Sequence, residues 1–256
     1  MANDDSRNSI FRSSNPTLSD KIFDKAGTAK RADAMTIQGT VDKLFVLTVL
    51  MLAAATATWV WSGTPEMVGL AMGLALIGCL GGLLVGMVLC FNMTWAPFLA
   101  PVYALCQGLC LGAVSLVYER AYHGIVVESL GLTISVLLVL LFAYKTRLIQ
   151  VTDHFRAGVI AATGAIALLY LVEWILGFFN IFIPYINDSG PIGIAFSLLV
   201  VFIASMNFVL DFDFIERGAE DGAPKFMEWY GAFGLLVTLI WVYLEILRLL
   251  AKMRRR

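Results

Sequence analysis

A stretch of 52 residues without a charged side chain, from residue 67 to residue 118, constrains the fold more than any other feature of this chain. A helix crosses the apolar core of a bilayer in about 20 residues, so the stretch is long enough for two crossings. Asn92, Pro97 and Pro101 interrupt it near its middle and predict the break between them. Hydrophobic residues make up 59% of the chain and charged residues 14%, which is typical of a protein that crosses a membrane several times.

Apolar runs alternate with short polar segments along the chain and predict an all-α membrane protein with seven transmembrane helices. Lys145 and Arg147 end the fourth run. A linker at residues 180–191 contains two prolines and a glycine, so it is not expected to be helical throughout. The predicted spans are residues 44–61, 68–91, 98–118, 125–144, 157–178, 192–210 and 229–250.

The polar start of the chain predicts a separate segment. The first 43 residues carry seven Lys or Arg and six Asp or Glu, and they contain no apolar core of a cleaved signal peptide. Residues 1–41 are therefore expected to form a largely disordered cytoplasmic tail, with a helical lead into the first span from Met35. Residues 42–256 are expected to form the seven-helix transmembrane domain.

Basic residues predict the orientation. With the tail inside, 12 of the 18 Lys and Arg residues lie on the inner side, but the five basic residues from Arg248 to Arg256 lie outside. The first helix usually dominates orientation, so we expect a cytoplasmic N-terminus and an outer C-terminus. A last segment that crosses only halfway would return the C-terminus to the inside.

Small residues at four-residue spacing predict close helix contacts in the second and third spans. Such spacing lets helix backbones approach each other in lipid, either inside one bundle, which we favour, or between two chains. Both spans are accordingly expected in the bundle interior. The glycines concerned are Gly69, Gly73, Gly78, Gly82, Gly86, Gly108 and Gly112. Four cysteines in the same spans have no His or carboxylate neighbours and are expected to be free thiols, with no firm metal site.

Acidic residues inside predicted spans are candidates for function, because a carboxylate in the apolar layer is costly unless it pairs, takes a proton or meets water. Glu173 lies late in the fifth span and Glu245 late in the seventh. Glu245 precedes Arg248 by three residues, so the two can also form a structural ion pair on one helix face. Glu128, at the start of the fourth span, is expected at the membrane interface.

The densest group of acids joins the last two spans. Residues 210–233 contain Asp211, Asp213, Glu216, Glu220, Asp221 and Glu228. On a helix, Asp211 and Asp213 point about 200° apart, so only one of them faces the bundle centre and the other meets water or a neighbouring segment. A solvated span end is one explanation of this cluster. Carboxylates crowded beside an apolar medium also make a proton-sensitive or cation-binding site, with Asp211, Asp213 and Glu228 as its candidate residues.

Several segments resemble the bacterial branch of the Bax inhibitor-1/YccA family (TMBIM-like). They are NPTLSD and MTIQGTVDK near the start, WAPFLAPVYALCQGLCLGAVSLVYE in the middle, and LDFDFIERGAEDGAPKFMEWYGAF and VYLEILRLL at the end. The resemblance covers nearly the whole chain and is most specific in its last 50 residues. It implies a seven-helix protein of the bacterial inner membrane whose last helix is central. It also implies a pH-sensitive calcium leak governed by an aspartate pair from the last two helices.

One residue departs from the family's pattern. Asp211 matches the first aspartate of the pair, but Thr238 stands where the second is expected. Asp213, Glu228 or Glu245 would then have to replace the missing partner, or this chain conducts no calcium.

The sequence lacks the residues or motifs that several competing functions require. A retinal pigment needs a lysine in the middle of the last span, where only the terminal Lys252 occurs. The G-x-S-G, H-E-x-x-H and G-x-G-D motifs of intramembrane proteases are absent. We therefore expect no enzyme, no cofactor apart from Ca²⁺ as a transported ion, and, at a net charge of −1, no nucleic-acid partner. The alternative to a leak is a non-conducting regulator whose tail and acidic loop bind another membrane protein, such as a quality-control protease.

Overall fold

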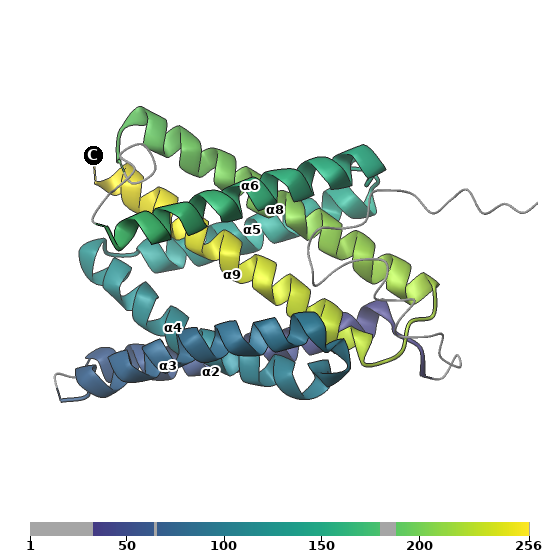
Figure 1. The fold of residues 1–256 in the computed structure, drawn as a ribbon, viewed down its shortest axis with the longest axis horizontal. Helices are drawn as coiled ribbons and strands as arrows, with labels where there is room; N and C mark the ends of the chain where they lie inside the picture. The colour runs from purple at the N-terminus through teal and green to yellow at the C-terminus, as the bar shows by residue number, and fades with distance from the viewer. Residues whose placement is uncertain (1–32, 64–65, 180–187, 256) are drawn as a thin grey trace, which may run out of the picture.

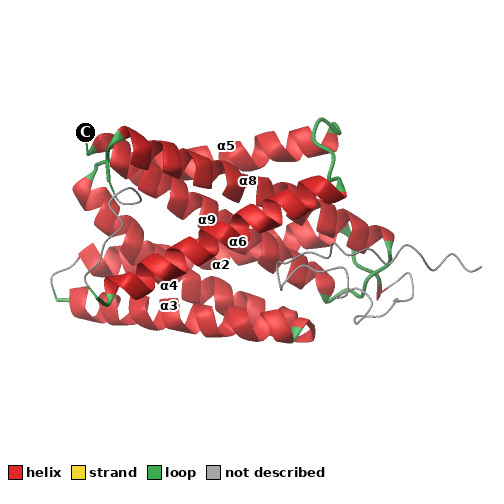
Figure 2. Cartoon of the chain, turned by 45° about the horizontal axis from the view of Figure 1, so that its top comes forward, coloured by secondary structure: helices red, strands yellow, loops and turns green. Residues whose placement is uncertain are grey.

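Long helices account for almost all of the chain that the computed structural model describes, which is residues 33–63, 66–179 and 188–255 (Figure 1). Seven of these helices are long and apolar enough to cross a membrane, and these residues form no strand, so the predicted seven-helix class is confirmed (Figure 2). The helices are α2 (Ile37–Gly63), α3 (Val68–Phe91), α4 (Ala96–Ala121), α5 (Ile125–Lys145), α6 (Asp153–Gly177), α8 (Pro191–Glu220) and α9 (Met227–Arg254), with a short 3₁₀ turn η2 (Met93–Trp95).

Local chemistry explains several helix ends. The predicted break in the long uncharged stretch falls at Asn92 and η2. Pro97 lies in the first turn of α4, where the N–H that proline lacks would have no partner within the helix. Pro101, expected to mark the same break, instead lies inside α4. The side chain of Thr152 caps α6 by accepting a hydrogen bond from the Phe155 N–H at 3.2 Å.

The two ends of the bundle are defined by contacts between distant segments. At one end, the Met35 N–H donates to the Ala223 carbonyl at 2.6 Å, on the turn between α8 and α9. At the other end, the Arg254 guanidinium donates to the His123 carbonyl between α4 and α5. The last helix therefore runs the full length of the bundle (Figure 1). Residues 33–36 and the end of α9 therefore lie at opposite ends of the bundle.

The last helix is the core of the fold, as expected. It packs against α2, α4, α5 and α8, and residues on every side of it are buried. Tyr230, Leu236 and Leu247 are fully buried in its length. Most residues of α9 are apolar, which suits a helix buried on every side, and its buried polar residues bond to neighbouring helices.

The second span was predicted to lie in the bundle interior. The helix that forms it, α3, does not lie there. It packs against α4 and α2 only along one side, and most of its leucines are exposed where lipid would lie. Gly78 and Gly82 give α4 its close approach, because an added Cβ would meet Cys106 and Gln107, whereas Gly69 and Gly73 face open space. Small residues therefore mark one contact face of α3, and its leucines face outward.

The glycines of α4 bring it against α2. A Cβ added at Gly108 or Gly112 would overlap the Met51 or Ala55 carbonyl, so these two helices touch backbone to backbone. Gly78, Gly82, Gly108 and Gly112 thus serve helix packing inside the bundle, whereas Gly69 and Gly73 do not. The cysteines of the two spans are free thiols.

The predicted tail lies outside the described residues up to residue 32, and so does most of the predicted non-helical linker, at residues 180–187. Met35 contacts the α8–α9 turn and α2 begins at Ile37, two residues after the expected helical lead. The packed domain thus starts before residue 42.

Candidate functional site

Asp211 lies in α8 with only 3% of its surface exposed, and its side chain faces α9. The Thr238 hydroxyl donates a hydrogen bond to Asp211 Oδ2 at 2.6 Å. Within the described part of the chain Asp211 has no ion-pair partner. Thr238, the residue that departs from the family's aspartate pair, is therefore its direct partner across the α8–α9 contact.

Asp213 lies on the opposite side of α8, as its two-residue offset from Asp211 requires. Its carboxylate accepts from Arg156 Nη2 of α6 at 2.6 Å and pairs with Arg217 Nε at 3.0 Å. Asp213 is also buried, so the segment that it meets is a neighbouring helix and not water. Close by, the Tyr144 hydroxyl donates to Glu216, which ties α5 to the same end of α8.

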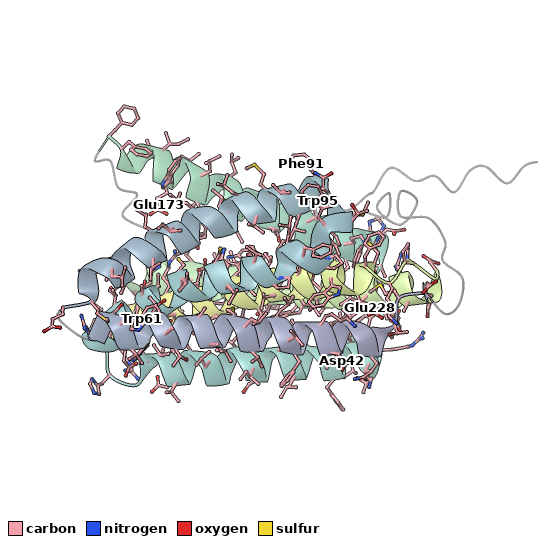
Figure 3. All side chains as sticks on the ribbon, turned by 90° about the horizontal axis from the view of Figure 1, so that it is seen from below. Asp42, Trp61, Phe91, Trp95, Glu173 and Glu228 are labelled. Carbon is pink, nitrogen blue, oxygen red and sulfur yellow. The ribbon has the colours of Figure 1, made fainter. Side chains whose placement is uncertain are left out.

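Glu228 is 1% exposed at the start of α9, and Figure 3 shows it near Asp42 at the end of the bundle opposite Trp61. Its carboxylate accepts from the N–H and hydroxyl of Thr36, at 3.1 and 2.9 Å, and pairs with Lys43 at 2.9 Å. Gly39 has no room for a Cβ beside this carboxylate. Glu228 therefore fastens the N-terminal segment to the bundle and does not face Asp211.

Glu245 and Glu173 lie toward the other end. Glu245 is 2% exposed, accepts from the Tyr170 hydroxyl at 3.0 Å, and forms the i, i+3 pair with Arg248 at 3.3 Å that its spacing predicted. Glu173 is half-buried on α6. None of the three candidate replacements, Asp213, Glu228 and Glu245, contacts Asp211.

A polar stripe on α6 was missed from the sequence. Arg156, Thr163 and Tyr170 are seven residues apart, so they lie on one face of the helix about two turns from one another. They bond in turn to Asp213, to Asn207 of α8 at 3.0 Å, and to Glu245. The seven-residue spacing was the available signal. Because of this spacing, α6, α8 and α9 share a column of buried and half-buried polar groups along the bundle.

Lys252 extends this column at the C-terminal end of α9. Its ammonium donates to the Ser197 hydroxyl at 2.7 Å and to the Gly193 carbonyl at 3.3 Å, both on the first turns of α8. Ser197 and Lys252 were not among the predicted site residues. No described group of His, Cys, Asp and Glu side chains has the arrangement of a metal site.

Comparison with known proteins gives a family. A model of proteins described as Bax inhibitor 1 like matches residues 15–255. No curated protein matches the chain.

Proposed function

Because the chain belongs to the Bax inhibitor 1 like family and is a multi-pass membrane protein, we propose that it passes cations through its bundle under the control of Asp211. Ca²⁺ is the ion that we assign, and protonation of Asp211 is the control. We assign the chain neither a catalytic activity nor a resident cofactor.

The burial of Asp211 and its single described polar partner are the main support for this proposal. Asp211 is a buried carboxylate between two long helices with a hydroxyl as its only described polar partner. An ionised carboxylate in such surroundings is costly unless a cation or water reaches it, so its protonation and the packing of α8 on α9 are coupled. A Ca²⁺ ion suits the same position because it binds carboxylate and hydroxyl oxygens.

We place the path along the polar column between α6, α8 and α9. This column does not include Asp211, so Asp211 acts on the path through the packing of α8 on α9. From one end to the other, this column offers oxygen atoms of Asp213, Asn207, Thr163, Tyr170 and Glu245. The ion pairs at its two ends, Arg156–Asp213 and Arg248–Glu245, hold carboxylates that a passing cation would compete for. α6 packs closely against α8 alone, so it is the helix that can shift at the smallest loss of apolar contact.

Thr238 changes the expected pH response. Two neighbouring carboxylates titrate as a coupled pair, whereas one carboxylate beside a hydroxyl takes up a single proton. We therefore expect the calcium flux to change with pH as a one-proton transition, with a slope near one.

Purified protein in liposomes loaded with a calcium dye tests the proposal. The expected result is a flux that depends on pH in the native chain and does not in Asp211→Asn. Asp221→Asn is the matched control, because Asp221 is an exposed acid at the same end of α8. A native chain without pH-dependent flux, or an unchanged response in Asp211→Asn, would rule out this function.

The contacts of residues 35–43 with the α8–α9 region favour a second function. Met35 pairs with Ala223 and Glu228 holds Thr36 and Lys43, so the segment that leads to residues 1–32 is docked on the acidic α8–α9 turn. Residues 33–36 and the α8–α9 turn thus lie together. We propose that the tail and this loop bind one membrane partner, a quality-control protease. The test is crosslinking of two chains to that protease, the intact chain and a chain that lacks residues 2–32. Equal capture of both chains contradicts this function, and so does absence of capture by the intact chain.

The location that we propose is the bacterial inner membrane, with the end that carries Met35 and the α8–α9 turn in the cytoplasm. Lys43, Lys145, Arg156 and Lys225 lie toward that end, which supports the assignment through the positive-inside tendency. In a chain with its native cysteines replaced, a cysteine at position 225 should react with an impermeant thiol reagent only after the membrane is opened. A cysteine at position 255 should react in intact cells, and the reverse result would invert the orientation.

A further inference from the structure

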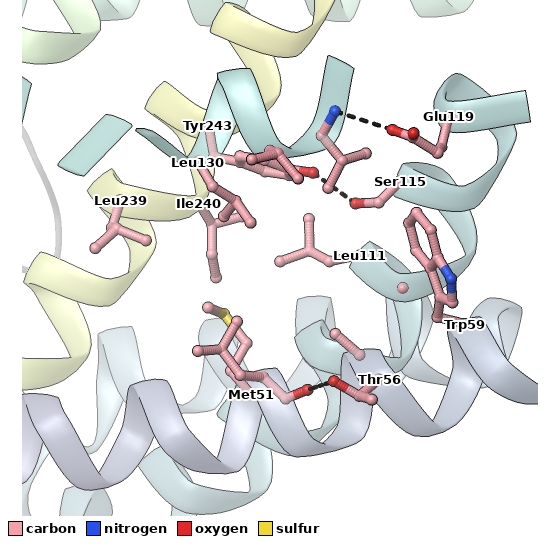
Figure 4. A pocket seen from close by; sticks show the side chains of 15 residues that line it. Met51, Thr56, Trp59, Leu111, Ser115, Glu119, Leu130, Leu239, Ile240 and Tyr243 are labelled. Atoms are coloured by element: carbon pink, nitrogen blue, oxygen red, sulfur yellow. Dashed lines mark hydrogen bonds between the residues drawn. The ribbon is translucent and has the colours of Figure 1, made fainter. Parts of the chain in front are cut away.

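A cavity of about 380 Å³ lies away from Asp211, among α2, α4, α5 and α9 (Figure 4). Met51 and Leu111 line its apolar body, and Leu239 and Ile240 of α9 form part of its wall (Figure 4). Sites for small molecules are typically of this size, mostly apolar, with a few placed polar groups. None of the polar column between α6, α8 and α9 lines it.

The cavity opens toward the lipid-facing surface between α2 and α5. Leu52 and Val127, which line it from these two helices, are 45% and 74% exposed. A ligand can therefore enter from the apolar layer of the membrane without passing through water. Only a molecule that dissolves in that layer has this route.

Polar groups gather at one end of the cavity. The Ser115 and Tyr243 hydroxyls share a hydrogen bond of 2.6 Å across the α4–α9 contact, with the Trp59 ring nearby (Figure 4). Glu119 is the single charged residue among those that line the cavity, which include no Lys or Arg. Its oxygens accept from the Gly124 and Val126 N–H groups, at 2.6 and 3.2 Å, at the start of α5.

These bonds explain why Glu119 is held as an anion, since a helix N-terminus favours negative charge. They do not use all of its capacity, because a carboxylate has about four acceptor positions and two are filled. The cavity thus joins an apolar body to one fixed negative charge, and two aromatic residues, Trp59 and Tyr243, also line it. Cations are attracted both to carboxylates and to aromatic faces.

We propose that this cavity binds a lipophilic organic cation, which enters from the bilayer between α2 and α5 and places its charge near Glu119 and Trp59. Charge complementarity selects this occupant over a neutral lipid chain, because a neutral chain leaves the remaining acceptor positions of the Glu119 carboxylate unused. Such a ligand contacts α9 at Leu239, Ile240 and Tyr243, on the helix that also carries Thr238.

The test uses tetraphenylphosphonium, with triphenylphosphine oxide as an uncharged analogue, and the purified protein in phosphatidylcholine nanodiscs. Equilibrium dialysis against empty nanodiscs separates binding from partition into lipid. The native chain should bind one tetraphenylphosphonium per chain. Glu119→Gln should weaken that binding by about fivefold, since Glu119 is half-buried and supplies the one charge among the residues that line the cavity. Binding of the uncharged analogue should change by less than about twofold.

Two further variants complete the design. Leu130→Trp places a larger side chain in the cavity and should remove saturable binding of both compounds. Glu128→Gln removes an acid from the same end of the bundle but outside the cavity, where it pairs with Arg254, and should bind as the native chain does. Unchanged thermal unfolding, together with retained binding of the uncharged analogue, verifies that Glu119→Gln is folded.

Three results would overturn the proposal. One is the absence of saturable tetraphenylphosphonium binding to the native chain. Another is equal affinity of the native chain for both compounds, which would identify the cavity as a site for neutral apolar molecules. The last is a loss in Glu128→Gln as large as that in Glu119→Gln, which would assign the effect to the surface charge at that end.

Discussion

Two buried aspartates two residues apart on α8 face different surroundings. Asp213 turns toward α6 and meets the guanidinium groups of Arg156 and Arg217, whereas Asp211 turns toward α9 and meets the Thr238 hydroxyl. The Asp213 carboxylate is paired with cationic groups, and the Asp211 carboxylate is not. Burial alone therefore does not distinguish a structural acid from a responsive one, but the partner does.

The other buried acids resemble Asp213. Glu228 pairs with Lys43 and Glu245 with Arg248. Among the predicted site residues that the structure buries, Asp211 is the exception. The α6 side of α8 is thus expected to respond to loss of an ion pair, and the α9 side to changes in a single hydrogen bond or proton.

The largest effect is expected at Arg156. Its replacement by Ala leaves Asp213 buried with only the half-exposed Arg217, and removing one partner of a buried pair costs about 3 kcal/mol. Thermal unfolding of the detergent-solubilised chain measures the loss. A cost no larger than that of an exposed pair would show that Asp213 is not held by Arg156.

A smaller loss is expected for Thr238→Val, which preserves shape and removes the hydroxyl. Asp211 then lacks its hydrogen-bond donor, at a cost of about 1–3 kcal/mol in the free energy of unfolding. Thr58→Val is a matched control, because the Thr58 hydroxyl is buried but bonds only to the Ala54 carbonyl of its own helix. Equal losses in the two variants would mean that the Asp211 contact has no special weight.

Arg217→Ala should cost less than about 1 kcal/mol. The Arg217 side chain is 43% exposed, and pairs with an exposed partner are screened by water. The same unfolding measurement, run beside Arg156→Ala, ranks the two arginines. A loss in Arg217→Ala that matches that in Arg156→Ala would reassign the main partner of Asp213.

The subtlest change concerns Thr238→Asp, which restores the carboxylate pair expected from the family. A second carboxylate beside Asp211 makes the two titrate as a coupled pair in two separated steps, so the pH dependence of calcium flux should become shallower than one proton or split into two steps. The liposome assay measures this slope. Identical slopes in the native chain and Thr238→Asp would contradict control by the α8–α9 contact.

Local sequence patterns were sufficient for the helices and for part of the site. In lipid, a spanning segment must satisfy its backbone hydrogen bonds internally, so the length and apolarity of each run determine a helix without reference to its neighbours. The i, i+3 pair of Glu245 with Arg248 and the opposite directions of Asp211 and Asp213 follow from helix geometry in the same way.

Contacts between helices were decided by the tertiary structure. Apolar spans are nearly equivalent in lipid, so hydropathy does not determine which of them is central, and α3 was wrongly expected inside. For the same reason the sequence did not reveal that Glu228 would meet Thr36, almost 200 residues away, or that Arg156, Thr163 and Tyr170 would face α8 and α9. The chain alone determined seven membrane-spanning helices and a candidate aspartate. Only packing decided that Asp211 meets Thr238, because a side chain's partner depends on the rotation and depth of two helices that the sequence describes separately.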